Sequence, residues 1–466
     1  MVIYDSAKKT KVPFVPIREN EASIYVCGPT VYDDAHLGHA RSALSFDLLV
    51  RTLKVLDYKV KLVKNFTDVD DKIINKMNET GQSLADITNH FIERYLYEMD
   101  CLGVLRGDIE PKATENIQQM SNMIQNLIDK ESAYLTPSGD VYFDTSKDSH
   151  YGSISHKVTE DEENQSRINH NSEKQNPKDF AMWKACSKDD SVCFDSPFSR
   201  GRPGWHIECS AMIDRYFDGD ENYHIDIHAG GVDLLFPHHE NEAAQSRCAT
   251  GKEIAKYWMH NGFVQIAGDK MSKSLGNSFF LKDALKIYDA EVLRFYLISI
   301  HYRNDFNFVE EDLLSAKKRL DKLYRLKKRV ALGKASIPNK DFKQSLLDAM
   351  SDDLNISVAL SVIDEMIAST NEELDKNPKN KVLKKETIAN IELIGQLLGV
   401  GGKEPYSYFQ IGIDDEVKSK IEALLSKRDK AKKSKDFETS DSIRDELNAM
   451  DIAIMDTADG TIWEKI

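Results

Sequence analysis

The sequence predicts an α/β protein in which a parallel sheet is followed by an α-helical bundle and a small C-terminal α+β unit. The first seventy residues read as strand, helix and strand, which is how a parallel sheet with crossover helices begins. Beyond residue 310 the apolar residues recur almost wholly at helical spacing. A glycine-rich stretch at residues 399–402 then sets apart a last segment of about sixty residues.

The first strand is expected at residues 24–27, a short β-prone run that stops at Gly28-Pro29. Residues 39–56 carry leucines at helical spacing, so we expect a helix there. A second strand is expected at residues 60–63, and a polar run follows it. Helical patterns fill residues 71–131, so the first half of the sheet domain is placed at residues 1–132.

Residues 133–200 are expected to form an insertion into this domain. Short strand-like pieces such as residues 140–143 occur in it, and between residues 155 and 176 only Val158 and Ile168 are clearly apolar. So polar a stretch is typical of a surface insertion or a mobile loop. Regular α/β patterning resumes near Gly201, which places the second half of the sheet domain at residues 201–309.

The remaining chain is predicted to form a helical bundle at residues 310–402 and a separate unit at residues 403–466. Two apolar stripes at helical spacing support the bundle: Ile356, Ala359, Leu360, Ile363 and Ile367, and then Ile391, Ile394 and Leu398. We interpret residues 399–402 as a linker. In the last unit two helices are expected to precede a hairpin that turns around Asp459-Gly460.

Composition narrows the classes of function. No apolar run approaches the roughly 18 residues that span a bilayer, and the N-terminus has no secretion signal, so we expect a cytoplasmic protein without a membrane partner. Six irregularly spaced cysteines also favour a reducing compartment. The 62 Lys and Arg against 77 Asp and Glu give a net charge of −15, which argues against indiscriminate coating of nucleic acid.

Local charge differs from the net charge in two segments. Residues 317–334 contain nine basic residues and one acid, and residues 418–435 contain eight basic residues and two acids. Because screening limits each charge to about 8–10 Å, these segments can form a polyanion site despite the negative total. Solvated helix faces explain the same pattern, so charge alone leaves both interpretations open.

The motif His36-Leu37-Gly38-His39 follows a strand, a Gly-Pro turn and an acidic pair, and it opens a helix. Free N–H groups at a helix start favour anions, and two imidazoles beside them can donate to phosphate oxygens. Gly38 has no Cβ, which lets a purine or ribose approach the backbone closely. Taken alone, the four residues are as compatible with coincidence as with a nucleotide site.

A second motif, Lys270-Met271-Ser272-Lys273-Ser274, follows a predicted strand at residues 262–266, in a loop that Gly268 introduces. Two lysines three apart with interleaved serines would bring positive charge and hydroxyl donors onto a triphosphate. They would stabilise the charge that develops as pyrophosphate leaves. A solvated lysine loop is the alternative, but both motifs together in this order favour the triphosphate site.

The two motifs resemble the signatures of class I aminoacyl-tRNA synthetases, and their surroundings are similar to those of the cysteinyl-tRNA synthetases in that class. Leu37 stands where the first signature usually has isoleucine, which is a conservative difference. The polar stretch 155–176 matches no motif of the family. The similar segments run through essentially the whole chain, and the most specific are residues 25–33, 65–72, 201–212 and 226–242.

This resemblance implies a Rossmann-type sheet split by a connective insertion, with magnesium accompanying ATP and one zinc ion per chain. It assigns the zinc ligands to Cys27, Cys209, His238 and Glu242. Spacing alone does not select these residues. His238 and Glu242 are four apart and share a helix face, but His239 and Glu242 are nearly as well placed. Cys27 and Cys209 lie 182 residues apart, where no spacing rule applies.

Further site residues follow from the resemblance. Gly230 and Gly231 resemble the glycines at which the backbone of the family approaches adenine. Asp233 resembles the carboxylate that binds the ribose hydroxyls. Trp205 is expected either to wall the amino-acid pocket or to anchor a loop to the core. Thr67 is expected near the substrate.

Two groups of residues receive no ligand. Asp68, Asp70 and Asp71 imitate a magnesium cluster, but Asp68 and Asp70 equally suit the capping of the next helix, so we assign them no metal. The other cysteines are expected to behave as small hydrophobic side chains: Cys101, Cys186, Cys193 and Cys248.

The family implies an enzyme that acts on ATP, L-cysteine and tRNA(Cys), and we expect it to be a monomer. His36 and His39 would hold phosphates, and Lys270 and Lys273 the departing pyrophosphate. The basic helices after residue 310 would follow the tRNA backbone, and the last unit would read anticodon bases, with Trp463 as a stacking platform.

Two alternatives remain open from sequence. The first is a related ligase that joins activated cysteine to an amino sugar and lacks a tRNA-reading tail. The second is a non-catalytic RNA-binding protein that retains the synthetase fold.

Overall fold

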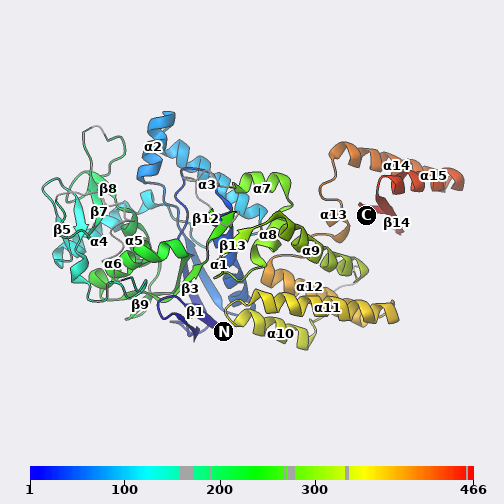
Figure 1. Ribbon diagram of the computed structural model, residues 1–466, viewed down its shortest axis with the longest axis horizontal. Helices are drawn as coiled ribbons and strands as arrows, with labels where there is room; N and C mark the ends of the chain where they lie inside the picture. The colour runs from blue at the N-terminus through cyan, green and yellow to red at the C-terminus, as the bar shows by residue number, and fades with distance from the viewer. Residues whose placement is uncertain are drawn as a thin grey trace.

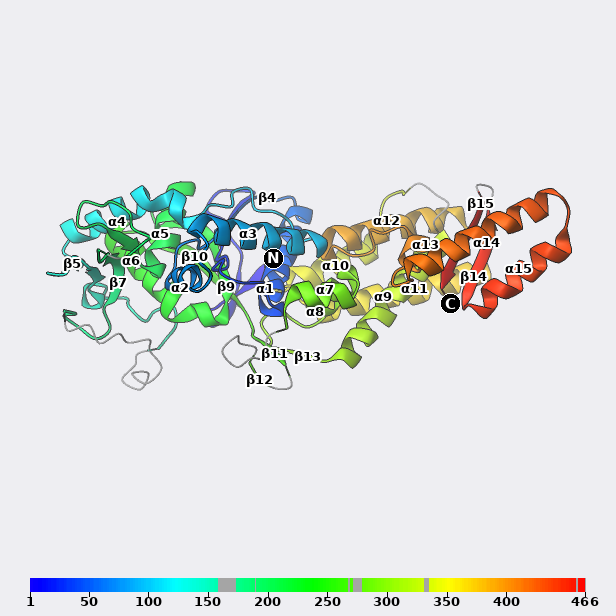
Figure 2. The same cartoon turned by 90° about the horizontal axis from the view of Figure 1, so that it is seen from above.

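The computed structural model describes residues 1–157, 173–188, 190–266, 269–270, 279–330, 335–457 and 460–465 of the 466-residue chain. The molecule is elongated, with the α/β domain at one end, the helical bundle in the middle and the C-terminal unit at the other end (Figures 1 and 2). Among the helices of these residues, none is both long enough and apolar enough to cross a membrane.

The central sheet is parallel, in the order β10-β9-β3-β4. Its strands are β3 (Glu21–Val26), β4 (Lys59–Lys64), β9 (Tyr223–Gly231) and β10 (Glu253–Asn261). Helix α1 (Leu37–Val55) connects β3 to β4 and buries its leucines against the sheet. The predicted strand–helix–strand opening is therefore confirmed, and the carboxyl ends of β3, β4 and β9 meet at one edge.

Helices and an antiparallel sheet follow β4. The helical pattern predicted for residues 71–131 corresponds to α2 (Asp71–Thr80), α3 (Leu84–Cys101), η1 (Ala113–Asn116) and α4 (Ile117–Asp129). The insertion forms an antiparallel sheet in the order β5-β6-β7-β8, with a short helical turn η2 (Thr145–Lys147). Its strands are β5 (Ala133–Leu135), β6 (Val141–Phe143), β7 (Phe180–Ala185) and β8 (Gly201–Pro203).

The cysteines outside the candidate metal group differ from expectation. Cys186 and Cys193 form a disulfide in the loop after β7, so treating them as free hydrophobic side chains was wrong. Their seven-residue separation places the bond within one loop. Cys101 is free but exposed, and Cys248 is free and half-buried against the core of the insertion.

The second half of the sheet domain carries α5 (Trp205–Tyr216), η3 (Val232–Leu234), η4 (Leu235–His239) and α6 (Glu240–Thr250). The strand predicted at residues 262–266 is present as β11 (Val264–Ile266), which pairs with β12 (Asp269–Lys270) and β13 (Phe306–Phe308). Two helices, α7 (Leu281–Ile287) and α8 (Ala290–Ile298), lie between β12 and β13 in the chain.

The bundle consists of α9 (Glu310–Val330), α10 (Lys340–Ser351), α11 (Ile356–Lys376) and α12 (Lys381–Leu398). Both predicted stripes are buried in its core. The glycine-rich break is confirmed, because α12 ends at Leu398 and Gly399 has φ 68°. The segment is not a loose connection, however: Val400 is buried and the Gly401 N–H donates to Glu291 Oε1 on α8 at 2.5 Å.

The C-terminal unit contains α13 (Pro405–Tyr408), α14 (Asp415–Lys433) and α15 (Phe437–Ala449). The hairpin of β14 (Ile452–Thr457) and β15 (Gly460–Lys465) is confirmed, although Asp459 lies outside the described residues. Trp463 is only 7% exposed and packs with Ile421, Leu447 and Ile452. The prediction that Trp463 offers a stacking surface to bases was therefore wrong, because its ring fills the core of the unit.

An N-terminal hairpin, β1 (Val2–Asp5) with β2 (Thr10–Pro13), packs beside β10. It reaches the bundle through Asp353, which accepts hydrogen bonds from the Tyr4 N–H and the Tyr302 hydroxyl. These contacts help to hold the sheet domain and the bundle together.

Candidate active site

A cavity of about 1240 Å³ opens at the carboxyl ends of the parallel strands. The predicted site residues that line it are Cys27, His36, Gly38, His39, Thr67, Trp205, Cys209, Gly231, Asp233 and His238. Glu242 and Gly230 are buried behind its wall. The structure does not describe the side chain of Lys270, and Lys273 lies outside the described residues.

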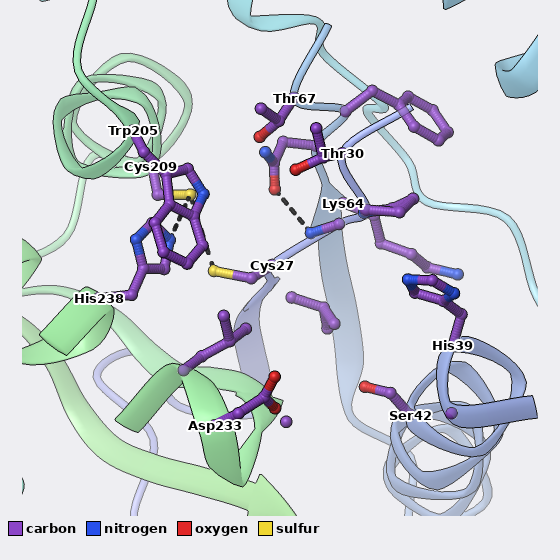
Figure 3. A pocket seen from close by; sticks show the side chains of 18 of the residues that line it. Cys27, Thr30, His39, Ser42, Lys64, Thr67, Trp205, Cys209, Asp233 and His238 are labelled. Atoms are coloured by element: carbon purple, nitrogen blue, oxygen red, sulfur yellow. Dashed lines mark hydrogen bonds between the residues drawn. The ribbon is translucent and has the colours of Figure 1, made fainter. Parts of the chain in front are cut away.

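At one side of the cavity the thiols of Cys27 and Cys209 lie beside the ring of His238 (Figure 3), and the carboxylate of Glu242 completes the group. Cys27 follows the end of β3, Cys209 lies in α5, His238 in η4 and Glu242 in α6. The distance between Cys27 Sγ and Cys209 Sγ is 3.7 Å, and that between Cys209 Sγ and His238 Nε2 is 3.8 Å. Glu242 Oε1 lies 3.9 Å from Cys27 Sγ and 2.8 Å from His238 Nε2.

This geometry suits a tetrahedral ion. With metal–sulfur bonds of about 2.3 Å, two thiolates on one zinc ion stand about 3.8 Å apart, close to the separation of Cys27 and Cys209. The group is therefore able to hold a metal ion, and its soft thiolates favour zinc over magnesium or calcium.

Several histidines surround this group, and two of them offer alternative ligands. Cys27 and Glu242 also form a second possible metal group with His228 and His239. His239 Nε2 lies 3.4 Å from Cys27 Sγ, close enough for both to bind one ion. Spacing in the sequence does not choose between His238 and His239, and the structure offers one possible metal group with each of them. Only the group with His238 includes both thiols, which is why we favour it for a soft ion.

Burial and close neighbours shift the protonation of these ligands. Burial would raise the pKa of Cys209, but the hydrogen bond with Cys27 and the neighbouring His238 lower it to about 6. Burial would also raise the pKa of Glu242, yet the charges of His238 and His228 lower it to about 2. Glu242 in turn outweighs burial at His238 and raises its pKa to about 10. Burial and the neighbouring Cys209 instead raise the pKa of Cys27 well above its usual value, so only Cys209 and Glu242 are predisposed to the deprotonated forms that bind metals.

His36 and His39 begin α1 and stack on each other, with ring centres 3.9 Å apart. His36 Nδ1 accepts a hydrogen bond from the Gly38 N–H at 3.0 Å, and His39 Nδ1 accepts one from the His36 N–H at 3.1 Å. Because a neutral imidazole whose Nδ1 accepts carries its hydrogen on Nε2, both rings are prepared to donate through Nε2.

Gly38 of the first motif and the pair Gly230-Gly231 leave room for other atoms of this chain. A Cβ on Gly38 would lie 2.8 Å from the His36 ring, so its absence allows that ring to fold back as the helix cap. A Cβ on Gly231 would lie 2.5 Å from Asp233 Oδ1, and one on Gly230 would lie 2.8 Å from Leu234 Cδ1. Gly231 and Asp233 thus form a tight turn at the cavity wall.

The side chain of Trp205 contacts both the cavity and one of the predicted metal ligands. It lines the cavity, and its ring stacks on His238 with centres 4.0 Å apart and planes 14° apart. Thr67 lines the cavity too, and its hydroxyl donates to Glu208 Oε2 at 2.8 Å. Glu208 is fully buried, which raises the pKa of its carboxyl well above the usual value.

The three aspartates after β4 have structural partners. Asp70 caps α2 by accepting from the Lys72 N–H, whereas Asp68 accepts from the N–H and hydroxyl of Thr114. Asp71 forms ion pairs with Lys184 and Arg202. The capping role is therefore confirmed for Asp70 but not for Asp68.

Comparison with known proteins agrees with this arrangement. Residues 13–318 match the family model of the tRNA synthetases class I (C) catalytic domain, residues 346–401 the DALR domain, and residues 414–463 the cysteinyl-tRNA ligase anticodon binding domain. A cysteine–tRNA ligase of a Sulfurovum species is 72% identical over 465 residues, which cover 100% of both chains. The chain belongs to the cysteine–tRNA ligase family.

Other members of the cysteine–tRNA ligase family are similar over their full length. The one from a Nitratiruptor species is 64% identical and that from Wolinella succinogenes 57%, with at least 99% of each chain covered.

More distant solved structures share the fold alone. A methionyl-tRNA synthetase of Mycobacterium tuberculosis in complex with methionyl-adenylate has a TM-score of 0.59 at 13% identity, over 81% of this chain and 92% of that one. A leucyl-tRNA synthetase of Agrobacterium radiobacter has a TM-score of 0.61 at 11% identity, over 83% of this chain and 85% of that one. They support the Rossmann-like sheet and the helical domain.

Sequence reasoning missed the second layer around the metal group of this cysteine–tRNA ligase family member. His228 Nε2 lies 2.6 Å from Glu242 Oε2, His206 Nδ1 lies 3.0 Å from His238 Nδ1, and His260 Nε2 lies 2.8 Å from His239 Nδ1. Such partners orient metal ligands. Their only common sequence signal is a histidine within the α/β-patterned residues 201–309, which by itself does not indicate a site.

Proposed function

We propose that this chain activates L-cysteine with ATP and transfers it to the terminal adenosine of tRNA(Cys), using zinc held by Cys27, Cys209, His238 and Glu242 to select the thiol. Membership in the cysteine–tRNA ligase family supports the enzyme class. The observation that carries the proposal is the position of the metal group in one cavity with His36 and His39.

The two sides of the cavity suggest how the substrates would lie. Figure 3 shows the sulfur atoms of Cys27 and Cys209 and the ring of His238 on one side, and His39 at the start of α1 on the other. A cysteine with its thiol at the metal group would direct its carboxylate toward phosphates held at His36 and His39. Such an arrangement supports in-line attack of a carboxylate oxygen on the α-phosphorus, which expels pyrophosphate.

Zinc held by the metal group would supply a borderline-soft Lewis acid that favours a thiolate over a hydroxyl. The residues of the chain have the remaining tasks. Trp205 walls the amino-acid side of the cavity and holds the His238 ring in place. Asp233 would accept hydrogen bonds from the ribose hydroxyls, and Gly231 keeps the backbone close to it.

Phosphate charge would be compensated by donors at both motifs. His36 and His39 would donate through Nε2 to phosphate oxygens, beside the N–H groups that begin α1. We propose that Lys270 and Lys273 stabilise the departing pyrophosphate, with magnesium accompanying ATP. The 2′-hydroxyl of the terminal adenosine would then attack the carbonyl carbon of the cysteinyl-adenylate and release AMP.

The elongated shape suits a tRNA that lies along the molecule (Figure 2). The basic segments are on α9 and α14, and the unit that contains α14 matches the anticodon binding model. That match disfavours the amino-sugar ligase, which would lack such a tail. Some α9 cations are already paired, as Arg319 is with Asp364, so the unpaired remainder would have to follow the tRNA backbone.

We also propose a monomer in the cytoplasm. A reducing compartment would keep Cys27 and Cys209 as thiols, and there we expect the Cys186–Cys193 bond to be reduced as well. Light scattering of freshly isolated protein tests whether it is a monomer. Thiol mass spectrometry of the same protein tests whether these cysteines are reduced.

The test of the function is L-cysteine-dependent exchange of pyrophosphate into ATP, followed by charging of tRNA(Cys). We expect both activities, with serine a far poorer substrate than cysteine. Exchange without charging would contradict the transfer step. Absence of exchange in a zinc-loaded, folded preparation would contradict the proposed function as a whole.

A further inference from the structure

The segments that open α1 and α7 are joined side by side, although about 240 residues separate them in the chain. The Leu281 N–H donates to Ala35 O at 2.8 Å, and the Leu37 N–H donates to Phe279 O at 3.2 Å. His36 and Phe280 therefore face each other as an isolated antiparallel bridge. The residue that caps α1 is thus attached to the chain that begins α7.

Side-chain charges extend this backbone bridge. Asp34, two residues before His36, is 8% exposed and accepts from Lys282 Nζ on α7 at 2.5 Å. Arg94 Nε on α3 lies 2.8 Å from the other oxygen of Asp34 and 3.4 Å from Glu98 Oε1. Asp34, Arg94 and Lys282, which we call the α1–α7 junction, thereby connect three elements beside the first motif.

We propose that the α1–α7 junction positions the start of α1, and with it His36 and His39, for adenylate formation. The proposal rests on the proposed function, because it assigns a role in that reaction. Its members are positioning residues, since Arg94 and Lys282 bind Asp34 just before α1 and none of the three lines the cavity. Displacement of a phosphate-binding group by about 1 Å can lower a rate by about 10²-fold, so a tie at the cap has kinetic consequences.

The charged groups of the junction are less exposed than those of a typical surface ion pair, so losing one of them should cost more. The Asp34 side chain is only 10% exposed, and the side chains of Lys282 and Arg94 are 28% and 34% exposed. Removing Lys282 leaves one oxygen of the largely buried Asp34 carboxylate without its partner, and Arg94 remains as the only cation of the junction beside it. Loss of the Lys282 ammonium should therefore shift the segment around Asp34.

The experiment compares Lys282→Met with a matched variant on the same helix. Lys286 pairs with Asp283 at 2.8 Å and its side chain is 70% exposed, so Lys286→Met, which removes a surface ion pair of the same helix, is the control. We measure cysteine-dependent pyrophosphate exchange and thermal unfolding for both. The variants Lys282→Arg, which keeps the charge, and Asp34→Asn, which removes the partner, complete the set.

Expected for Lys282→Met is a kcat about 10–100-fold below the parent, with the KM for cysteine within about twofold, because the metal group lies elsewhere in the cavity. Lys282→Arg should restore most of kcat, Asp34→Asn should resemble Lys282→Met, and Lys286→Met should match the parent. Equal kcat values for Lys282→Met and Lys286→Met would overturn the proposal, as would a loss that Lys282→Arg fails to restore. A parent without exchange activity would instead refute the proposed function, and the junction's role with it.

Discussion

At the scale of single residues, the proposed choice between cysteine and serine depends on one atom. A pocket that only accommodates a side chain separates near-isosteres by about 10²-fold. A zinc ion adds chemical discrimination, because it binds a thiolate readily whereas a serine hydroxyl holds its proton. The convergence of Cys27, Cys209, His238 and Glu242 makes that route available in one binding step.

Cys209→Ser is therefore expected to lose metal, to raise the KM for cysteine steeply and to narrow the gap between cysteine and serine. Metal analysis and pyrophosphate-exchange kinetics check these effects. Cys248→Ser is the matched control, since Cys248 is free, half-buried and outside the metal groups of the described residues. A folded and fully active parent preparation with far less than one zinc per chain would end this mechanism.

A second prediction concerns the aromatic residues of the C-terminal unit. Trp463 is buried, whereas Phe437 at the start of α15 is 65% exposed. Since stacking on one base contributes about 1–3 kcal/mol, Phe437→Ala should lower kcat/KM for tRNA about tenfold or more and leave pyrophosphate exchange unchanged. Trp463→Ala should instead lower the unfolding temperature of the unit. If Phe437→Ala charges tRNA like the parent, Phe437 does not contact it.

At the scale of elements, the start of α6 binds residues 151–155 of the insertion. Glu240 is buried and accepts hydrogen bonds from the N–H groups of Gly152, Ile154 and Ser155, at 2.9, 3.1 and 2.8 Å. The adjacent Asn241 accepts from the Tyr151 hydroxyl at 2.5 Å. The helix that carries Glu242 thus also anchors part of the insertion beside the cavity.

Glu240→Ala should leave these three N–H groups without their acceptor and lower the free energy of unfolding by roughly 3 kcal/mol, since each orphaned buried group costs about 1–3 kcal/mol. Hydrogen exchange at residues 152–155 should accelerate at the same time. Chemical denaturation and exchange mass spectrometry provide the two measurements. Glu253→Ala, which removes a half-exposed partner of Arg247, is the control. Unchanged exchange at residues 152–155 would contradict the anchoring role.

The hairpin of the C-terminal unit gives a pH-dependent element. The hydrogen bond from Arg428, together with those from Thr461 and Lys432, holds the pKa of Asp456 well below its usual range despite partial burial. A lowered carboxyl pKa contributes stability above the unfolded pKa of about 3.9, and this contribution is lost as pH falls through and below that value. We expect the unit to be less stable at pH 3 than at pH 5. Asp456→Asn should weaken this dependence, as followed by Trp463 fluorescence, and an unaltered pH profile would refute the assignment.

At the scale of the whole molecule, the C-terminal tail is attached to the sheet domain before its own fold begins. Lys403 Nζ lies 2.6 Å from Asp289 Oδ2, and Tyr408 stacks on Tyr324 of α9 with ring centres 3.7 Å apart. The Tyr324 hydroxyl in turn donates to Glu291 of α8. Activation and anticodon reading are therefore best separated after α13, and not at the glycines.

Deleting residues 414–466 should leave cysteine-dependent pyrophosphate exchange within about threefold of the parent, because the cavity lies in the sheet domain. Charging of tRNA should fall sharply and depend less on the anticodon. Deleting residues 403–466 should in addition lower the unfolding temperature, since it removes Lys403 and Tyr408. Both truncations are assayed for exchange, charging and melting. A shorter protein that charges tRNA as well as the full chain would show that the tail does not read the anticodon.

Local patterns in the sequence were sufficient for the elements and for the two motifs. The strand that ends before Cys27, the helix that His36 opens and the stripes of α11 and α12 follow from periodicity and caps, which act within a few residues. The resemblance of the two motifs and the segments around them identified the family and indicated the four metal ligands. Each of these inferences needs only neighbours along the chain or a known pattern.

Contacts between distant residues were decided by the path of the chain. The four metal ligands come together because the carboxyl end of β3, α5, η4 and α6 pack around one point; they are Cys27, Cys209, His238 and Glu242. No spacing rule reaches across the 182 residues between the two cysteines. The same holds for Asp34 with Lys282. Burial is decided in the same way: the aromatic pattern does not distinguish Trp463, which fills a core, from exposed Phe437. Sequence sets local conformation, whereas packing of the elements determines which side chains meet and which face solvent.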